Sequence, residues 1–267
     1  MKPSEVVTTL APLAALGMPI LFEDNHLLVV AKPAGLLSQA AARGDDNLVD
    51  RAKAYVKAAY AKPGNAFIGL VHRLDRNTSG VVVLAKTSKA AERLAEQFRL
   101  RSTDKRYLAV VHGVTADRGR LVHLLAEGPE RMTAVPEAGR APAQILDAKA
   151  ASLTFVRLAV ASGAPGAPSP ASLVEVGLET GRKHQIRVQF ATVGHRLVGD
   201  VRYRGASRTL EPAGWAPLDA RMRRPALHAR SIAFAHPVSR DERCFIAEIP
   251  EDFQTLVRAL GWAALVG

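Results

Sequence analysis

The sequence contains a single cysteine, Cys244, and no long apolar run. One cysteine excludes an internal disulfide and is typical of proteins from a reducing compartment. A membrane-spanning helix needs about 18 consecutive apolar residues, and no stretch approaches that length. The first 19 residues are interrupted by Glu5, Pro12 and Gly17 and lack the layout of a signal peptide. These absences predict a cytoplasmic protein with no membrane partner.

Acidic residues are also scarce: 25 Asp and Glu stand against 36 Lys and Arg, a formal net charge of +11. An excess of this size favours polyanionic partners such as RNA, DNA or a membrane surface. The hydrophobic content of 48% is ordinary, and 267 residues suffice for a substantial core in one large or two small domains. We expect an N-terminal arm over residues 1–19 and a folded domain over residues 20–267.

Apolar patterns and turn residues predict a strand-rich chain with scattered helices. Strands are expected within residues 20–26, 27–31, 81–85, 103–113, 153–159 and 173–178. Helices are expected over residues 46–61, near 186–193 and over 251–260. A further helix is expected to begin at a Ser88 cap, with the apolar stripe Ala91, Leu94, Ala95 and Phe98. Short strands and loops are expected over residues 114–150, and a hairpin connector is expected over residues 161–172. Residues 202–230 are arginine-rich and are expected to be loop-like, and with Trp215 they form either an RNA-backbone surface or a plain basic loop.

The most informative stretch is His72-Arg73-Leu74-Asp75-Arg76-Asn77-Thr78-Ser79-Gly80, followed by the apolar run Val81 to Lys86. Its turn-forming residues predict a loop that leads into a buried strand. Asp75 lies between basic neighbours, and an acid among cations stays ionised, which suits a nucleophile or an anion-orienting group. A surface turn with an Asp–Arg pair is the alternative that this pattern leaves open.

A second motif is Thr180-Gly181-Arg182-Lys183-His184-Gln185-Ile186-Arg187. Ile186, Phe190 and Val193 are spaced as one face of a helix, and Gly194 follows its end. Arg187 then lies on an adjoining face, from which it can reach a site. No pair of histidines has metalloprotease spacing, so we predict no metal site.

The first motif, with Thr78-Ser79-Gly80 and the strand after it, resembles the signature of the RluA-type pseudouridine synthases. Further similar segments follow that family's order over roughly residues 20–255: Lys32-Pro33-Ala34-Gly35, the strand with Tyr107, and the second motif. Gln39 stands near the position where the family commonly has a histidine. The resemblance is to a stand-alone catalytic domain, without the N-terminal RNA-binding domain of many relatives.

This resemblance implies an α+β pseudouridine synthase fold: a mixed, mostly antiparallel sheet with flanking helices and a central catalytic cleft. It implies isomerisation of uridine in rRNA or tRNA to pseudouridine, with the target base flipped out of its helix. Asp75 would be the catalytic carboxylate, Tyr107 would stack on the base and move a proton, and Arg187 would pair with Asp75. The implied substrate-binding residues are His72, Arg73, Thr78, Arg182, His184 and Gln185. No cofactor is implied, and we expect a monomer.

Two other functions are compatible with parts of the sequence. A non-catalytic RNA-binding or assembly protein could keep the fold, but it has no need of Asp75, Tyr107 and Arg187 together. On residues alone, the preferred interpretation of Tyr107 is a core aromatic with a satisfied hydroxyl. A hydrolase could use Asp75 with a histidine such as His72, but no second carboxylate or nucleophile stands in a recognised motif.

Overall fold

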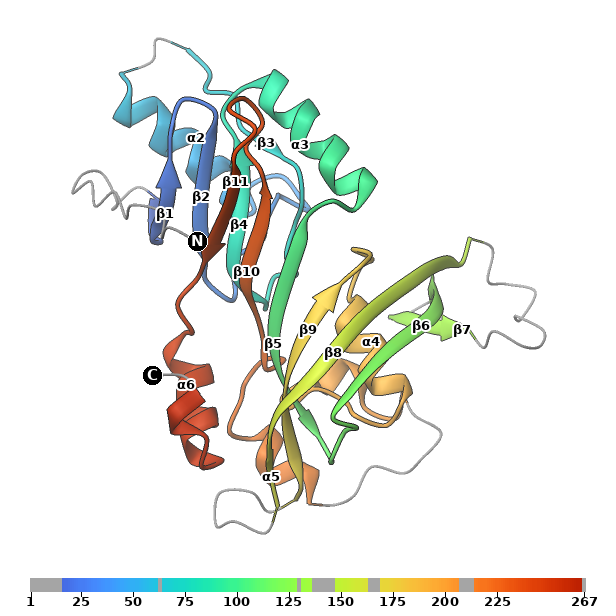
Figure 1. Cartoon of the computed structure of the whole chain (residues 1–267). Helices are drawn as coiled ribbons and strands as arrows, with labels where there is room; N and C mark the ends of the chain where they lie inside the picture. Colours follow the sequence, from blue (N-terminus) through green and yellow to red (C-terminus); the bar gives the residue numbers. More distant parts are fainter. Residues whose placement is uncertain are drawn as a thin grey trace. The chain divides into compact units, whose positions relative to one another are not determined.

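The computed structural model describes residues 16–61, 64–128, 131–135, 147–162, 169–206 and 214–265 (Figure 1). The chain forms two compact units. The first unit takes the chain up to Lys105 and, later, Ala229–Glu248, and the second takes Arg106–His228 and Ile249–Gly267. In the part of the chain described here, no helix is long and apolar enough to cross a membrane.

The sheet of the first unit is built around one fully buried strand. Its strands are β1 (Ile20–Glu23), β2 (Leu27–Lys32), β3 (Gly69–Leu70), β4 (Ser79–Ala85), β10 (Leu227–Ala235) and β11 (Glu242–Ile246). They run in the order β1-β2-β4-β10, with β11 paired to β10 and β3 paired to β4. Every residue of β4 is buried, which explains its continuous apolar sequence. β4 starts directly after the loop that carries Asp75.

Two helices belong to this unit, α2 (Leu48–Ala59) and α3 (Ser88–Leu100). The side chain of Thr87 accepts a hydrogen bond from the N–H of Ala90, so Thr87 caps α3 and the expected cap, Ser88, is the first residue of the helix. The predicted stripe of α3 is correct for Leu94, which is fully buried, and wrong for Ala95, which is exposed. Adjacent helical residues lie about 100° apart, so Ala95 turns away from the face that buries Leu94.

The predicted arm over residues 1–19 lies mostly outside the described residues, which begin at residue 16. Leu16 and Met18 are buried, and the carbonyl of Pro19 accepts a hydrogen bond from the N–H of Ala31. The end of the predicted arm is therefore packed on the first unit. The boundary between an arm and a domain at residue 20 stays a prediction.

The sheet of the second unit is an antiparallel array in the order β5-β9-β8-β6-β7. Its strands are β5 (Asp104–His112), β6 (Arg118–Glu127), β7 (Met132–Val135), β8 (Lys149–Ala161) and β9 (Ala171–Leu178). The pairing of β8 with β9 confirms the predicted hairpin, whose connector lies outside the described residues at 163–168. The expectation of only short strands within 114–150 is wrong, because β6 has ten residues. Several charged residues on β6 obscure its apolar pattern.

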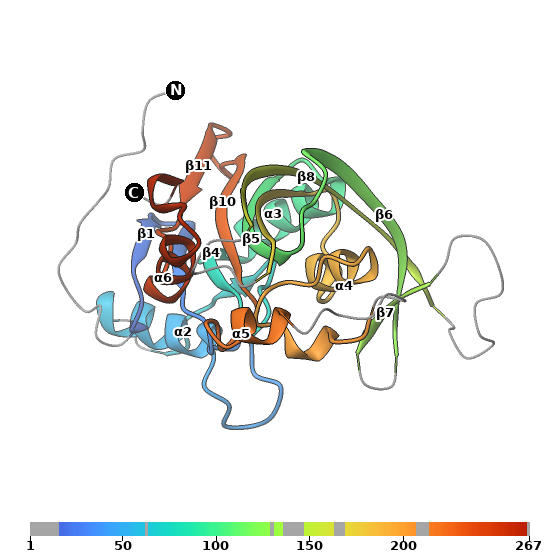
Figure 2. The same cartoon turned by 90° about the horizontal axis from the view of Figure 1, so that it is seen from below.

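The helical segments of the second unit are α4 (Gln185–Thr192), η1 (Val201–Tyr203), α5 (Trp215–Asp219), α6 (Glu251–Ala259) and η2 (Ala263–Leu265). α4 lies against β6, β7 and β8 (Figure 2), with Val188 and Ala191 packed on Leu125 of β6. Val193 was expected on the buried face of this helix but is 41% exposed, because the helix ends at Thr192.

Residues 202–230 are not the open loop that the sequence predicted, because they contain α5 and the start of β10. Trp215 is buried, and its ring stacks on that of His112 with centroids 4.2 Å apart. Trp215 is therefore a core residue and not part of an RNA-binding surface. Arg224 is also buried, whereas Arg221 and Arg223 are exposed.

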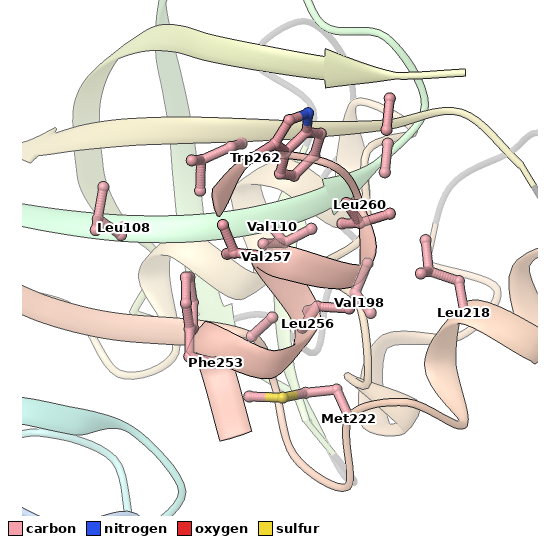
Figure 3. Close-up of a cluster of buried hydrophobic side chains, with 14 of the residues drawn as sticks. Leu108, Val110, Val198, Leu218, Met222, Phe253, Leu256, Val257, Leu260 and Trp262 are labelled. Atoms are coloured by element: carbon pink, nitrogen blue, oxygen red, sulfur yellow. The ribbon is translucent and has the colours of Figure 1, made fainter. Parts of the chain in front are cut away.

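One apolar cluster of the second unit includes the buried face of α6. Phe253, Leu256 and Val257 of α6 pack against Leu108 and Val110 of β5 (Figure 3). Burial of each such side chain contributes about 1.5–3 kcal/mol, so this cluster is a major source of the unit's stability. Sheets with a few packed helices in both units confirm the predicted α+β class.

Candidate active site

The loop that carries Asp75 is held by hydrogen bonds on both sides of that residue. On one side, the N–H of Leu74 donates to Oγ of Ser38 at 3.1 Å, and the Ser38 hydroxyl donates back to the Leu74 carbonyl at 2.8 Å. Ser38 is only 4% exposed. The backbone N–H and C=O of Leu74 are thus both hydrogen-bonded to one buried hydroxyl.

On the other side, the carbonyl of Arg76 accepts from the N–H of Gly35 at 2.8 Å and from Nζ of Lys32 at 3.2 Å. Nε of Arg76 donates to the Gly35 carbonyl at 2.9 Å. Lys32 is 1% exposed, and its Nζ also donates to the carbonyls of Pro33 and Leu36, each at 2.8 Å. The turn at residues 32–38 therefore clamps the loop at residues 74 and 76, and Asp75 lies between them, half-buried. Pre-positioning of this kind is what a catalytic carboxylate needs.

His72 has a structural task beside this loop. Its Nε2 accepts a hydrogen bond from the N–H of Val83 at 2.9 Å, and its ring stacks on Phe98 with centroids 4.8 Å apart. Burial, with a smaller contribution from the Lys105 charge, lowers the pKa of His72 to about 3. The expectation that His72 is one of the cations around Asp75 is therefore wrong. A hydrolase that uses His72 as its base loses support, because the accepting nitrogen is occupied.

Gly80 ends the loop in a conformation that requires glycine. Its φ is +125°, and a Cβ there would lie 2.2 Å from the carbonyl oxygen of Ala229. Thr78 and Ser79 just before it are buried, whereas Arg73 is exposed. The predicted substrate contacts of Thr78 and Arg73 stay predictions.

In the second unit, Gln185 is buried and its amide is used within the protein. Oε1 accepts from the Thr180 hydroxyl at 2.7 Å and from the N–H of Arg182 at 3.0 Å, and Nε2 donates to the Ser152 carbonyl at 3.0 Å. These bonds shape the loop that leads into α4. They give Gln185 a structural role, and its predicted contact with substrate stays untested.

His184 precedes α4 in the left-handed conformation, with φ 54°. Such a backbone costs a non-glycine residue about 1 kcal/mol or more and persists only where its surroundings hold it. Nδ1 of His184 lies 2.9 Å from the Tyr203 hydroxyl, which supplies such a contact. Arg182 is exposed, and its Nε donates to the Ala150 carbonyl at 3.3 Å. Its predicted contact with substrate stays a prediction.

Arg187 lies in the first turn of α4 and is 7% exposed. Its Nε and Nη2 donate to the two carboxylate oxygens of Asp200 at 2.6 and 2.8 Å. The guanidinium carbon lies 5.2 Å from the centre of the Tyr203 ring, a cation–π distance. Sequence reasoning missed this pair, because no periodicity links residues 187 and 200.

The predicted site residues thus fall into two groups. His72, Arg73, Asp75 and Thr78 share one loop of the first unit, and Arg182, His184, Gln185 and Arg187 share one segment of the second. Tyr107 lies on β5, 8% exposed, opposite Val176 of β9. The pairing of Arg187 with Asp75 and the catalytic role of Tyr107 stay predictions. Among the described residues, no cluster of His, Cys, Asp and Glu could hold a metal ion.

Solved structures with a similar fold are pseudouridylate synthases. Human RNA Pseudouridylate Synthase Domain Containing 4 aligns with a TM-score of 0.74 and 24% identity, over 93% of this chain and 95% of that chain. Human RNA Pseudouridylate Synthase Domain Containing 1 aligns with a TM-score of 0.66 and 23% identity, over 94% and 90%. These similarities define the fold class.

The sequence comparison identifies the family. Residues 26–192 match the family described as RNA pseudouridylate synthase. Ribosomal large subunit pseudouridine synthase D of Zymomonas mobilis is 38% identical over 247 residues, which cover 91% of this chain and 73% of that protein. The protein of the same name from Xylella fastidiosa is 36% identical over 246 residues, 91% of this chain and 69% of that protein. The chain belongs to the RNA pseudouridylate synthase family, which confirms the predicted resemblance and makes it an RNA uridine isomerase.

Proposed function

We propose that this enzyme converts specific uridines of large-subunit ribosomal RNA to pseudouridine, with Asp75 as the catalytic carboxylate. The observation that carries the proposal is the clamped loop: residues on both sides of Asp75 are hydrogen-bonded to the turn at residues 32–38. The choice of ribosomal RNA is supported by the names of the relatives, which align over 91% of this chain. A net charge of +11 suits a polyanionic substrate.

The reaction is an isomerisation, so its atoms balance without a second reactant. The bond between N1 of uracil and C1′ of ribose breaks, the base rotates, and a bond forms between C5 and C1′. C5 loses a proton and N1 gains one. A uridine inside a helix has to be flipped out first, at a cost of a few kcal/mol, which contacts of basic side chains with phosphates offset.

Each predicted residue has a task in this scheme. Asp75 acts as nucleophile or ion-stabilising carboxylate at the nucleoside, and a rigid loop lowers the entropy cost of bringing it to the reacting atoms. Arg187 keeps Asp75 ionised and oriented, because a cation at about 4 Å lowers a carboxylate pKa by about 1–3 units. Tyr107 stacks on the base and takes part in proton transfer at C5, and Arg73 fills the space that the flipped base leaves.

The remaining proposals concern the surroundings of the reaction. His72, Thr78, Arg182, His184 and Gln185 line the substrate-binding region or shape it. The enzyme works in the cytoplasm as a monomer, without a small-molecule cofactor. The single cysteine supports a reducing compartment, and light scattering of the purified chain tests the monomer.

The test is release of tritium from RNA labelled at C5 of uridine. Unmodified ribosomal RNA and unmodified transfer RNA are assayed separately, with Asp75→Asn as the control. We expect release from ribosomal RNA by the wild type, and no turnover by Asp75→Asn although its RNA affinity stays within a few-fold. Release from transfer RNA alone would show that the substrate is transfer RNA and not ribosomal RNA. No release from either, with tight RNA binding retained, would favour the non-catalytic RNA-binding protein.

A further inference from the structure

A buried chain of charged side chains runs through the second unit and ends on Arg187. It begins at Asp219, whose Oδ2 accepts from Nη2 of Arg196 at 2.7 Å. Oδ1 of Asp219 accepts from the N–H of Gly199 at 2.7 Å and lies 2.9 Å from Nε2 of His112. Arg196 and Asp219 are 2% and 6% exposed, so both charges depend on these contacts.

This cluster holds the turn that presents Asp200. Nη1 of Arg196 donates to the backbone carbonyl of Asp200 at 3.1 Å, while Asp219 binds the N–H of the preceding Gly199. Gly199 has φ +76°, and a Cβ there would lie 2.2 Å from the Arg224 carbonyl oxygen. The turn is therefore close-packed, and hydrogen bonds hold its backbone at Gly199 and at Asp200. Because Asp200 is also buried, its carboxylate is restricted to one orientation.

That carboxylate binds the Nε–Nη2 edge of Arg187 with both oxygens, at 2.6 and 2.8 Å. A guanidinium is planar and its N–H groups have fixed directions, so an anion on one edge determines where the Nη1 N–H groups point. The Tyr203 ring, 5.2 Å from the guanidinium carbon, restricts the plane of the group from a second side. Arg187 thus depends on the Asp200 turn for its orientation.

We propose that Asp200 is a positioning residue for the reaction: it aims the Arg187 guanidinium, and the buried Asp219–Arg196 pair holds Asp200 in place. The inference rests on the role proposed above for Arg187. Asp200 acts through Arg187 and touches no substrate. Its removal should therefore slow the chemical step and leave the affinity for RNA unchanged.

The experiment compares Asp200→Asn with the wild type in the tritium-release assay. Asparagine keeps the shape of the side chain but loses the charge and one acceptor. We expect kcat to fall about 10- to 100-fold, as for a catalytic group misplaced by a fraction of an ångström, while KM and the RNA Kd stay within about twofold. Asp200→Glu keeps the carboxylate and shifts it by one methylene, so a smaller loss of kcat is expected.

Two further variants separate positioning from a merely structural ion pair. If Asp200 acts through Arg187, Asp200→Asn causes no additional loss of kcat in an Arg187→Ala background. Asp252→Asn is the matched control, because Asp252 holds Arg224 of the same unit by two bonds of 2.7 and 2.9 Å. It should lower the melting temperature without lowering kcat.

Each outcome decides one point. An inactive wild type would refute the proposed function, and the positioning role of Asp200, which depends on that function, would be refuted with it. An active wild type with unchanged kcat in folded Asp200→Asn would overturn the positioning role. If Asp200→Asn does not fold, Asp200→Glu decides in its place. Additive losses in the double variant, or an equal loss in Asp252→Asn, would also overturn the proposal.

Discussion

Replacing Ser38 by alanine removes one oxygen atom and, with it, both hydrogen bonds that hold the Leu74 peptide beside Asp75. Each bond contributes about 1 kcal/mol net, and a buried N–H or C=O left without a partner costs about 1–3 kcal/mol. The site is buried and relaxes in part, so we expect the free energy of unfolding to fall by about 2–3 kcal/mol. A protein of ordinary stability, about 5–15 kcal/mol, remains folded after this loss.

The same change should lower turnover, because the loop loses one of the two points at which it is clamped. We expect kcat in the tritium-release assay to fall about tenfold, with RNA affinity preserved. Ser172 offers a matched control: its buried Oγ accepts from the N–H of Thr115 at 3.1 Å and donates to the carbonyl of Gly113 at 2.8 Å. Ser172→Ala breaks two bonds of the same lengths in the second unit.

Urea unfolding measures the stability of both variants, and the kinetic assay is run where both are folded. Similar losses of stability with a loss of kcat only in Ser38→Ala are the expected result. If Ser172→Ala slows turnover as much as Ser38→Ala, the effect is one of general stability. If Ser38→Ala turns over at the wild-type rate, the clamp is not needed to orient Asp75.

Two other predictions concern the same region. Gly80→Ala should lower the free energy of unfolding by about 3 kcal/mol or more, since φ is +125° and the added Cβ meets the Ala229 backbone. Gly181→Ala, where no atom lies within 4 Å of the added Cβ, should change it by less than about 1 kcal/mol in the same denaturant titration. His72 should make stability depend on pH, because its folded pKa of about 3 lies below the ordinary histidine value of 6.5 and the unfolded chain takes up the proton first. Its contribution is complete above pH 6.5 and is lost toward pH 3 at about 1.4 kcal/mol per pH unit, so the stability of His72→Gln should fall by about 2 kcal/mol less than that of the wild type between pH 6.5 and 5. Parallel stability curves would contradict a lowered pKa of His72 in the folded chain.

Local patterns were enough to predict most of the elements that carry the site. The apolar run after Gly80, the Asn47 cap of α2 and the spacing of Ile186 and Phe190 each arise from neighbours within a few residues. The motif around Asp75 also identified the family without the structure. The elements that were missed include β6 and α5, which have mixed or short apolar patterns.

Contacts between distant segments decided what those elements do. Ser38 lies 36 residues from Leu74, and Lys32 lies 44 residues from Arg76, so no periodicity predicts the clamp that they form. The sequence predicts Arg187 as a cation on the helix face next to that of Ile186, and only the fold brings the Asp200 carboxylate against it.

The sequence by itself thus determined the family and the α+β class, because these depend on residue type and local spacing. On the same basis it predicted which residues carry the catalytic chemistry. The tertiary structure alone decided that Nε2 of His72 accepts from the N–H of Val83, that Trp215 is a core residue and that Asp200 binds Arg187. Burial and the direction of a hydrogen bond depend on which segments meet, and that is a property of the folded chain.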